Sequence, residues 1–87
     1  MAITTGQLTV VDATPVQLDT SSVSNFKLMI HNMSNTDNLY IGNDTVTPTT
    51  GLEVHSHNYI TLECQPNDQV FVCSSNGSHT LSWMKIQ

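Results

Sequence analysis

Short runs of apolar residues that alternate with polar ones, separated by turn-forming residues, recur along the chain. In the clearest run, residues 26–32, Phe26, Leu28 and Ile30 alternate with more polar side chains, as in a strand with one buried face. Seven other segments have the alternation or composition of strands: 7–11, 16–18, 39–42, 52–55, 59–62, 70–72 and 80–86. No segment shows helical periodicity. The pattern predicts an all-β fold, a small antiparallel β-sandwich or Greek-key-like barrel of 7–8 short strands.

Two turn signals in the last third of the chain predict how its final strands pair. Gln65-Pro-Asn-Asp68 has turn chemistry, because proline presets φ and the Asn and Asp side chains can bond their own backbone. Asn76-Gly77 is a strong hairpin signal. These signals predict that 59–62, 70–72 and 80–86 form a three-stranded antiparallel meander.

The length of 87 residues predicts a single β domain over residues 7–87, preceded by a flexible N-terminal arm of residues 1–6. A chain of this size buries only about 60–65% of its unfolded surface, so its core is thin. Charged residues make up 10% of the chain, against roughly 25% in an average globular protein. A surface this poor in charge suits a subunit packed beside neighbours better than a free monomer.

The charge balance argues against two classes of partner. Lys27 and Lys85 are the only basic residues other than histidine, and the formal net charge is −5. Binding to a phosphate backbone requires several Lys or Arg, so we expect no nucleic acid partner, and the same shortage disfavours an anionic membrane. No stretch has the roughly 18 apolar residues of a membrane span, and the N-terminus lacks the features of a signal peptide. The chain is therefore expected to be made in the cytoplasm.

Cysteine and histidine offer little metal or redox chemistry in this sequence. With a short turn between their strands, Cys64 and Cys73 would lie too far apart to bridge, so both are predicted to be buried free thiols. His55 and His57 would share a strand face and could bind zinc together with Glu53 or a cysteine. The closely paired ligands of structural zinc sites are absent, which favours exposed histidines, no metal and no cofactor.

The residue types of a hydrolytic triad are present, but no Gly-x-Ser-x-Gly motif is, and the chain has little room for a large cleft. We therefore expect no enzyme activity. Tyr40, Tyr59 and Trp83 have two interpretations. They form a stacking platform for a glycan, or each packs its ring in the core with the polar tip in water.

Several segments in the last two-thirds of the chain share the strand and turn residues of one group of proteins. They are Ile30-His-Asn-Met-Ser34, Asn38-Leu-Tyr-Ile-Gly-Asn-Asp-Thr-Val-Thr47, Gly51-Leu52, Ile60-Thr-Leu62 and Val70-Phe-Val-Cys-Ser-Ser-Asn-Gly77. This pattern resembles that of small all-β virion proteins of tailed bacteriophages, and the segment from Asn38 to Thr47 is its most specific part. The Gln65-Pro-Asn-Asp68 turn departs from the usual turn before the last hairpin.

The resemblance implies a structural role and no catalytic residues. The expected function is that of a capsid decoration or cement subunit, which binds the outer surface of the major capsid protein lattice and stabilises the head. Such a protein is made in the host cytoplasm and resides on the capsid surface of the virion. The alternative is a tail- or fibre-associated module, or an adhesin that binds host glycans.

Two of the predicted strands carry apolar side chains on both faces. In 80–86, Met84 and Ile86 lie opposite Leu81 and Trp83, and in 26–32 Met29 lies on the face opposite the apolar alternation. A free sandwich keeps one face of each strand polar. Met29, Met84 and Ile86 are therefore candidates for an interface in a homo-oligomer. A trimer is the first choice, because three-fold positions abound on an icosahedral shell.

Overall fold

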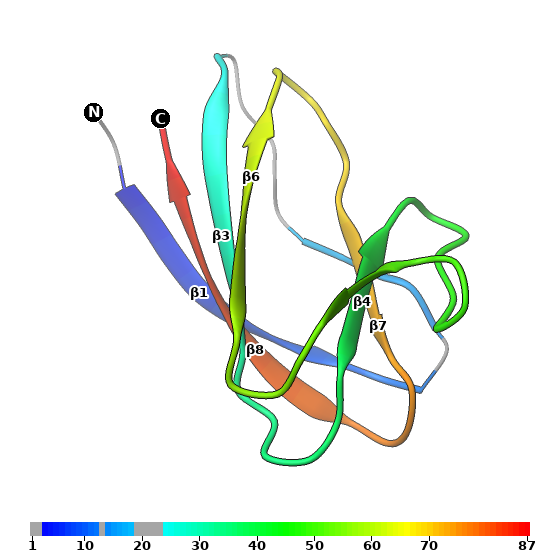
Figure 1. Ribbon diagram of the computed structural model, residues 1–87. Coiled ribbons are helices and arrows are strands. Elements are labelled where there is room, and N and C mark those ends of the chain that lie inside the picture. Colours follow the sequence, from blue (N-terminus) through cyan, green and yellow to red (C-terminus); the bar gives the residue numbers. More distant parts are fainter. Residues whose placement is uncertain (1–2, 13, 19–23) are drawn as a thin grey trace.

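The computed structural model describes residues 3–12, 14–18 and 24–87, which form eight β-strands and no helix (Figure 1). The strands are β1 (Ile3–Val10), β2 (Val16–Gln17), β3 (Phe26–Asn32), β4 (Leu39–Gly42), β5 (Leu52–Val54), β6 (Tyr59–Cys64), β7 (Phe71–Ser74) and β8 (His79–Ile86). The all-β prediction is confirmed. Each predicted strand segment overlaps one of these eight strands.

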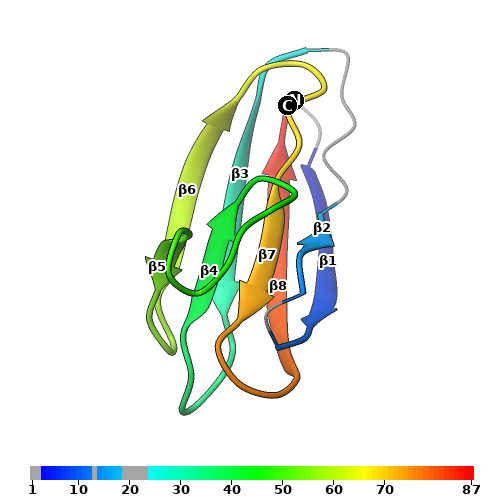
Figure 2. The same cartoon turned by 90° about the vertical axis from the view of Figure 1, so that its right-hand side faces the viewer.

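The strands form two four-stranded antiparallel sheets. The first sheet has the order β1-β8-β3-β6 and the second has the order β2-β7-β4-β5; Figure 2 shows the second sheet in front. β1 pairs with β8, β2 with β7, β3 with β6 and β4 with β5, always antiparallel. The chain is thus folded like one long hairpin whose bend lies between β4 and β5, wrapped into two layers. This strand order is that of an eight-stranded jelly roll.

The alternation in the sequence explains why the two sheets pack together. Along β3, Phe26, Leu28 and Ile30 are buried while the residues between them are exposed or half-buried, and β6 alternates in the same way. Because successive side chains of a strand point to opposite faces, one face of each sheet lines the space between the layers. The buried residues in this core are Val10, Leu18, Phe26, Leu28, Ile30, Leu39, Ile41, Val54, Cys64, Val70, Val72 and Leu81.

The predicted meander of the last three strands is wrong. β6 pairs with β3, β7 lies between β2 and β4, and β8 lies between β1 and β3, so consecutive strands alternate between the sheets. The turn chemistry itself is present, since the Gln65 N–H donates to Asp68 Oδ2 at 2.8 Å and Asn67 has a φ of 66°. These turns carry the chain across the core from one layer to the other. β7 needs this position because Val72, Cys73 and Ser74 are all buried, as in a central strand.

The predicted boundary of the N-terminal arm is wrong for residues 3–6. β1 begins at Ile3, and its pairing with β8 runs without interruption from Ile3 opposite Ile86 to Val10 opposite His79. The first two residues of the predicted arm lie outside the described residues. Ile3, Thr4 and Thr5 are β-branched, which suits a strand, and the long partner strand β8 supplies the backbone hydrogen bonds that hold them.

Candidate functional site

The solvent side of the first sheet is the most distinctive surface of the molecule, and we call it the outer face. Its residues form three rows across β1, β8, β3 and β6, as the strand registers show. The rows are Ile3, Ile86, Lys27 and Glu63; Thr5, Met84, Met29 and Thr61; and Gln7, Ser82, His31 and Tyr59.

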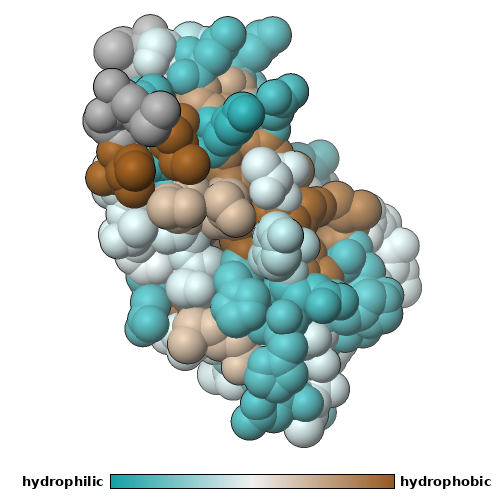
Figure 3. Space-filling model, turned by 60° about the vertical axis from the view of Figure 1, so that its left-hand side comes forward, coloured by the Kyte–Doolittle hydropathy of each residue, from teal (hydrophilic) through white to brown (hydrophobic). Residues whose placement is uncertain are grey.

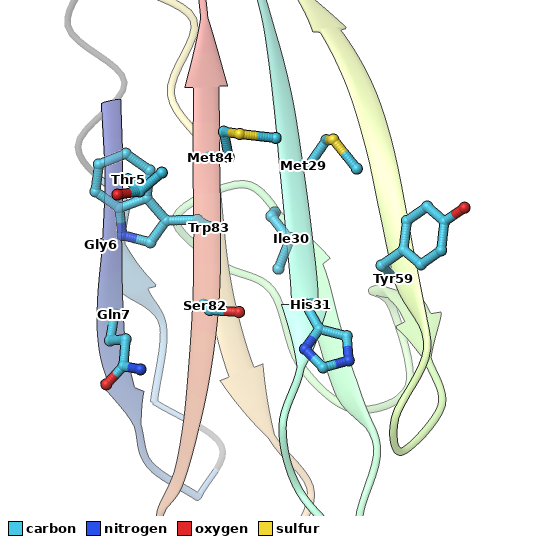
Figure 4. Close-up of a pocket in the computed structure, with 10 residues that line it drawn as sticks. All are labelled: Thr5, Gly6, Gln7, Met29, Ile30, His31, Tyr59, Ser82, Trp83 and Met84. Carbon is cyan, nitrogen blue, oxygen red and sulfur yellow. The ribbon is translucent and has the colours of Figure 1, made fainter. Parts of the chain in front are cut away.

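Apolar side chains occupy the middle of the outer face. Met84 and Met29 are directly opposite each other on neighbouring strands, and both are half-buried. In Figure 4 the Met84 side chain extends from β8 towards β3, and the Met29 side chain lies on the β6 side of β3 at the same height. Ile86 is next to Ile3 in the adjacent row, and Ile3 is 60% exposed. Apolar patches are visible among the polar surface in Figure 3. The structure therefore brings the three predicted interface residues together, and adds Ile3.

A hollow of about 520 Å³ lies on this face. Its floor includes Met29 and Met84, and polar groups of Gln7, Ser82 and His31 lie at one end (Figure 4). A volume of this size is within the range of small-molecule sites, which are about 300–1,000 Å³. The hollow is open, and its mixture of apolar floor and polar rim matches the core and rim of protein interfaces.

The outer face is close to neutral although the chain is acidic. Its charged residues are Lys27 and Glu63, which are directly opposite each other on β3 and β6. The other described acidic residues lie outside the first sheet, in loops or on β5: Asp12, Asp37, Asp44, Glu53 and Asp68. The outer face therefore carries one basic and one acidic side chain, and no net formal charge apart from His31.

The predicted aromatic platform is not assembled. Tyr40 lies on β4 in the second sheet, where its hydroxyl donates to Glu53 Oε2 at 3.3 Å. Tyr59 is 65% exposed on the outer face, at the edge strand β6. Trp83 packs against the core from the inner side of β8 and crosses Gly6, where a Cβ would lie 2.7 Å from Trp83 Cζ2. Tyr40 is thus separated from the other two rings by the whole sandwich. Tyr59 and Trp83 both line the hollow described above, but β3 lies between their strands and Trp83 extends towards β1 (Figure 4), so the three rings form no common stacking surface.

No known protein family matches the sequence, and no curated protein is significantly similar to it. Its function must therefore be inferred from the fold and from the surface that the fold exposes. The described part of the chain contains no helix long and apolar enough to cross a membrane.

The histidines of the predicted alternative zinc site have other roles. His55 Nε2 lies 3.0 Å from Glu53 Oε1, and both side chains are substantially exposed. His57 adopts a φ of 63° in the turn before β6, where its N–H donates to the Asn32 carbonyl at 3.0 Å. Among the described residues, no three His, Cys, Asp or Glu side chains are close enough together to hold a metal ion.

Both cysteines are buried and free. Burial raises the pKa of the Cys64 thiol, with a smaller contribution from the Asp68 carboxylate, and the pKa of Cys73 is raised by burial and by Asp12. The thiol is the unreactive form, so both groups are protected from alkylation in the folded protein.

We predict that native protein at neutral pH reacts slowly with a thiol reagent, and that two thiols titrate after denaturation without reductant. A count of zero would show that the cysteines are oxidised. The pKa values of both thiols are higher in the folded than in the unfolded protein, so their contribution to the free energy of unfolding is present at neutral pH. This contribution is lost as the pH rises above about 8.5, because the thiols then ionise in the unfolded protein before they do so in the folded protein. Urea unfolding at pH 7 and pH 10 measures this loss.

Sequence reasoning missed Ile3, Thr5 and Gln7 as parts of the outer face. These residues belong to the segment Ile3-Thr-Thr-Gly-Gln-Leu-Thr-Val10, in which they alternate with smaller or inward-facing residues. This alternation is a weak strand signal, because threonine and glutamine are also common in loops. The length of β8 is the better indication, since an eight-residue strand at the end of the chain requires a partner of similar length.

Proposed function

We propose that the chain is a structural virion protein of a tailed phage, acting as a capsid decoration or cement subunit. The observation that carries the proposal is the neutral, apolar-centred outer face on a small β-sandwich with very few charges. A monomer has no need of such a face. A subunit that is always surrounded by neighbours gains stability from burying it.

The fold is compatible with this role. Eight-stranded jelly rolls occur in viral capsid proteins and in lectin domains, so the function is argued from the outer face and not from the fold alone. The jelly roll also fits the resemblance of several segments of the sequence to small phage virion proteins.

In this role the subunit binds the outer lattice of major capsid protein and bridges neighbouring capsomers. Each contact between subunit and capsid is small, but the contact is repeated over the whole shell. The total area that these contacts bury stabilises the capsid against the internal pressure of its packed DNA. The outer face serves self-association, through Met29, Met84 and Ile86, with a trimer as the proposed oligomer. The second sheet and the loops, which carry most of the acidic side chains, are then available to the capsid.

Particle stability tests this function. Capsids lacking the protein are expected to rupture at lower temperature, or at a lower chelator concentration, than the same capsids after the purified protein is added back. Attachment should depend only weakly on salt, because a chain with two lysines offers few charge pairs beyond those of its carboxylates. Equal resistance with and without the protein would favour the alternative, a tail- or fibre-associated adhesin that uses the exposed Tyr59 beside His31 to stack on a glycan.

A further inference from the structure

The edge formed by β1 is the least protected edge of the two sheets. An edge strand exposes backbone N–H and C=O groups that can pair with another strand, and proteins usually block such edges with charge, proline or short length. β2 has two residues and follows Pro15, and β5 has three residues. β6 has six residues, and its single charged residue, Glu63, lies on the outer face. β1 has eight residues, with neither charge nor proline.

The direction of the strands makes the opposite edge of the same sheet a suitable partner for β1. The first sheet has four strands, each antiparallel to its neighbour, so β1 and β6 run in opposite directions. If the copies are related by rotation about an axis that runs parallel to the strands, β1 of one copy lies beside β6 of the next copy and runs antiparallel to it. The two edges of the first sheet can therefore form the same contact between every pair of neighbouring copies.

We propose that three copies of this chain close into a ring through these edges, with their outer faces turned towards a three-fold axis. This arrangement rests on the self-association proposed above and specifies how it is built. β1 of each copy pairs with β6 of the next. The three first sheets then form the sides of a triangular prism, whose interior is filled by the side chains of the outer face.

Sheet dimensions favour three copies over four. Strands are spaced about 4.8 Å apart, so a four-stranded sheet is roughly 14–19 Å wide. In a three-sided prism the centre of each such sheet lies roughly 4–5.5 Å from the axis. Two sheets that pack face to face are about 10 Å apart, so each lies about 5 Å from the plane midway between them. The distance from each sheet to the three-fold axis is similar, so side chains can fill the interior of the prism. In a four-sided ring the distance grows to roughly 7–10 Å, which leaves an unfilled channel.

The middle row of the outer face fits its place in the prism. Met84 and Met29, on the two central strands, lie nearest the axis, and methionine packs well in irregular interiors. Thr5 on β1 and Thr61 on β6 belong to the same row, so Thr5 of one copy lies at the height of Thr61 in the next. Pairs of threonine side chains across strands are favourable.

Paired cysteines test this contact in the purified protein. The double variant Thr5→Cys/Thr61→Cys is expected to form disulfide-linked trimers on mild oxidation, seen by non-reducing electrophoresis and lost with reductant. Within one copy these positions are three strand spacings apart, about 14 Å, which exceeds the reach of a disulfide. Tilted strands shift the register by two residues without changing faces, so Thr5→Cys is also combined with Tyr59→Cys and with Glu63→Cys.

Wild type and the four single variants are the controls, and their buried native thiols are expected to stay unlinked. Efficient dimers of the Thr5→Cys single variant would show that β1 pairs with β1 of another copy, which overturns the ring. A ladder of longer products would show an open chain and also overturns it. The absence of disulfide-linked products in all three double variants would also overturn the ring. A failure of capsid stabilisation with intact cross-linked trimers would instead overturn the cement function.

Discussion

Replacing Asn32 with alanine is expected to lower the free energy of unfolding by about 3–5 kcal/mol, the largest loss for any single polar side chain of the described core. Asn32 is fully buried at the end of β3. Its Nδ2 donates to the carbonyls of Asp37 and Val54 at 2.9 and 3.0 Å, and its Oδ1 accepts from the Ser34 N–H at 2.9 Å. Alanine leaves these three backbone groups without their partner.

The loss is large because it affects two layers at once. Asn32 lies in the first sheet, Val54 lies on β5 in the second sheet, and Asp37 belongs to the loop that joins β3 to β4. One side chain therefore holds the connection between the sheets at this end. Each buried group that loses its hydrogen bond costs about 1–3 kcal/mol, and total stabilities of small domains are only about 5–15 kcal/mol.

Urea unfolding followed by the fluorescence of Trp83, the only tryptophan, measures this loss. Asn35→Ala, at an exposed position in the same loop, is the matched control and should change stability by no more than about 0.5 kcal/mol. Asn32→Asp retains the acceptor for Ser34 but loses both donors, and it should be at least as unstable as the alanine variant at neutral pH. A change below about 1 kcal/mol in Asn32→Ala would contradict this account of the side chain.

Strand positions follow from local sequence in this protein, but strand partners do not. Alternation located β3 at its observed bounds, since 26–32 has buried residues at every second position. The pairing of β6, β7 and β8 was predicted wrongly, because turn residues report that the chain reverses and not which layer it enters. Asn76-Gly77 illustrates this: Gly77 has a φ of 69°, as its turn requires, yet the turn joins strands of different sheets.

The alternation of apolar and polar residues predicts which residues of a single strand belong to the outer face, but not which strands lie next to each other. Met29, Met84 and Ile86 each stand out within a single strand, because each breaks the polar side of an amphipathic pattern. Their proximity depends on the pairing of β3 with β8, which are far apart in the sequence. The predicted stacking platform of aromatic residues is wrong because it was not based on the alternation within a strand. Tyr40, Tyr59 and Trp83 were grouped by residue type, and type carries no information on sheet or face.

Met84→Asp is expected to convert the homo-oligomer into a folded monomer. Met84 is half-buried at the centre of the outer face, opposite Met29, and in a trimer it lies nearest the axis. Burying a methionine contributes about 1.5–3 kcal/mol, and three carboxylates near one axis repel one another as well. A loss of about 3 kcal/mol per subunit weakens each contact by roughly 100-fold or more.

Light scattering at tens of micromolar protein measures the mass, and circular dichroism with urea unfolding establishes that the variant is folded. Leu52→Asp is the control for charge, because Leu52 is 53% exposed in the second sheet, and it should leave the oligomer intact. Leu81→Asp, at a fully buried position of the same strand β8, should unfold the protein. If Met84→Asp behaves like Leu81→Asp, Met84 belongs to the core of one chain. If wild type is already a monomer, the outer face does not join copies of this chain. A folded monomer in Met84→Asp alone is the result that self-association through this face requires.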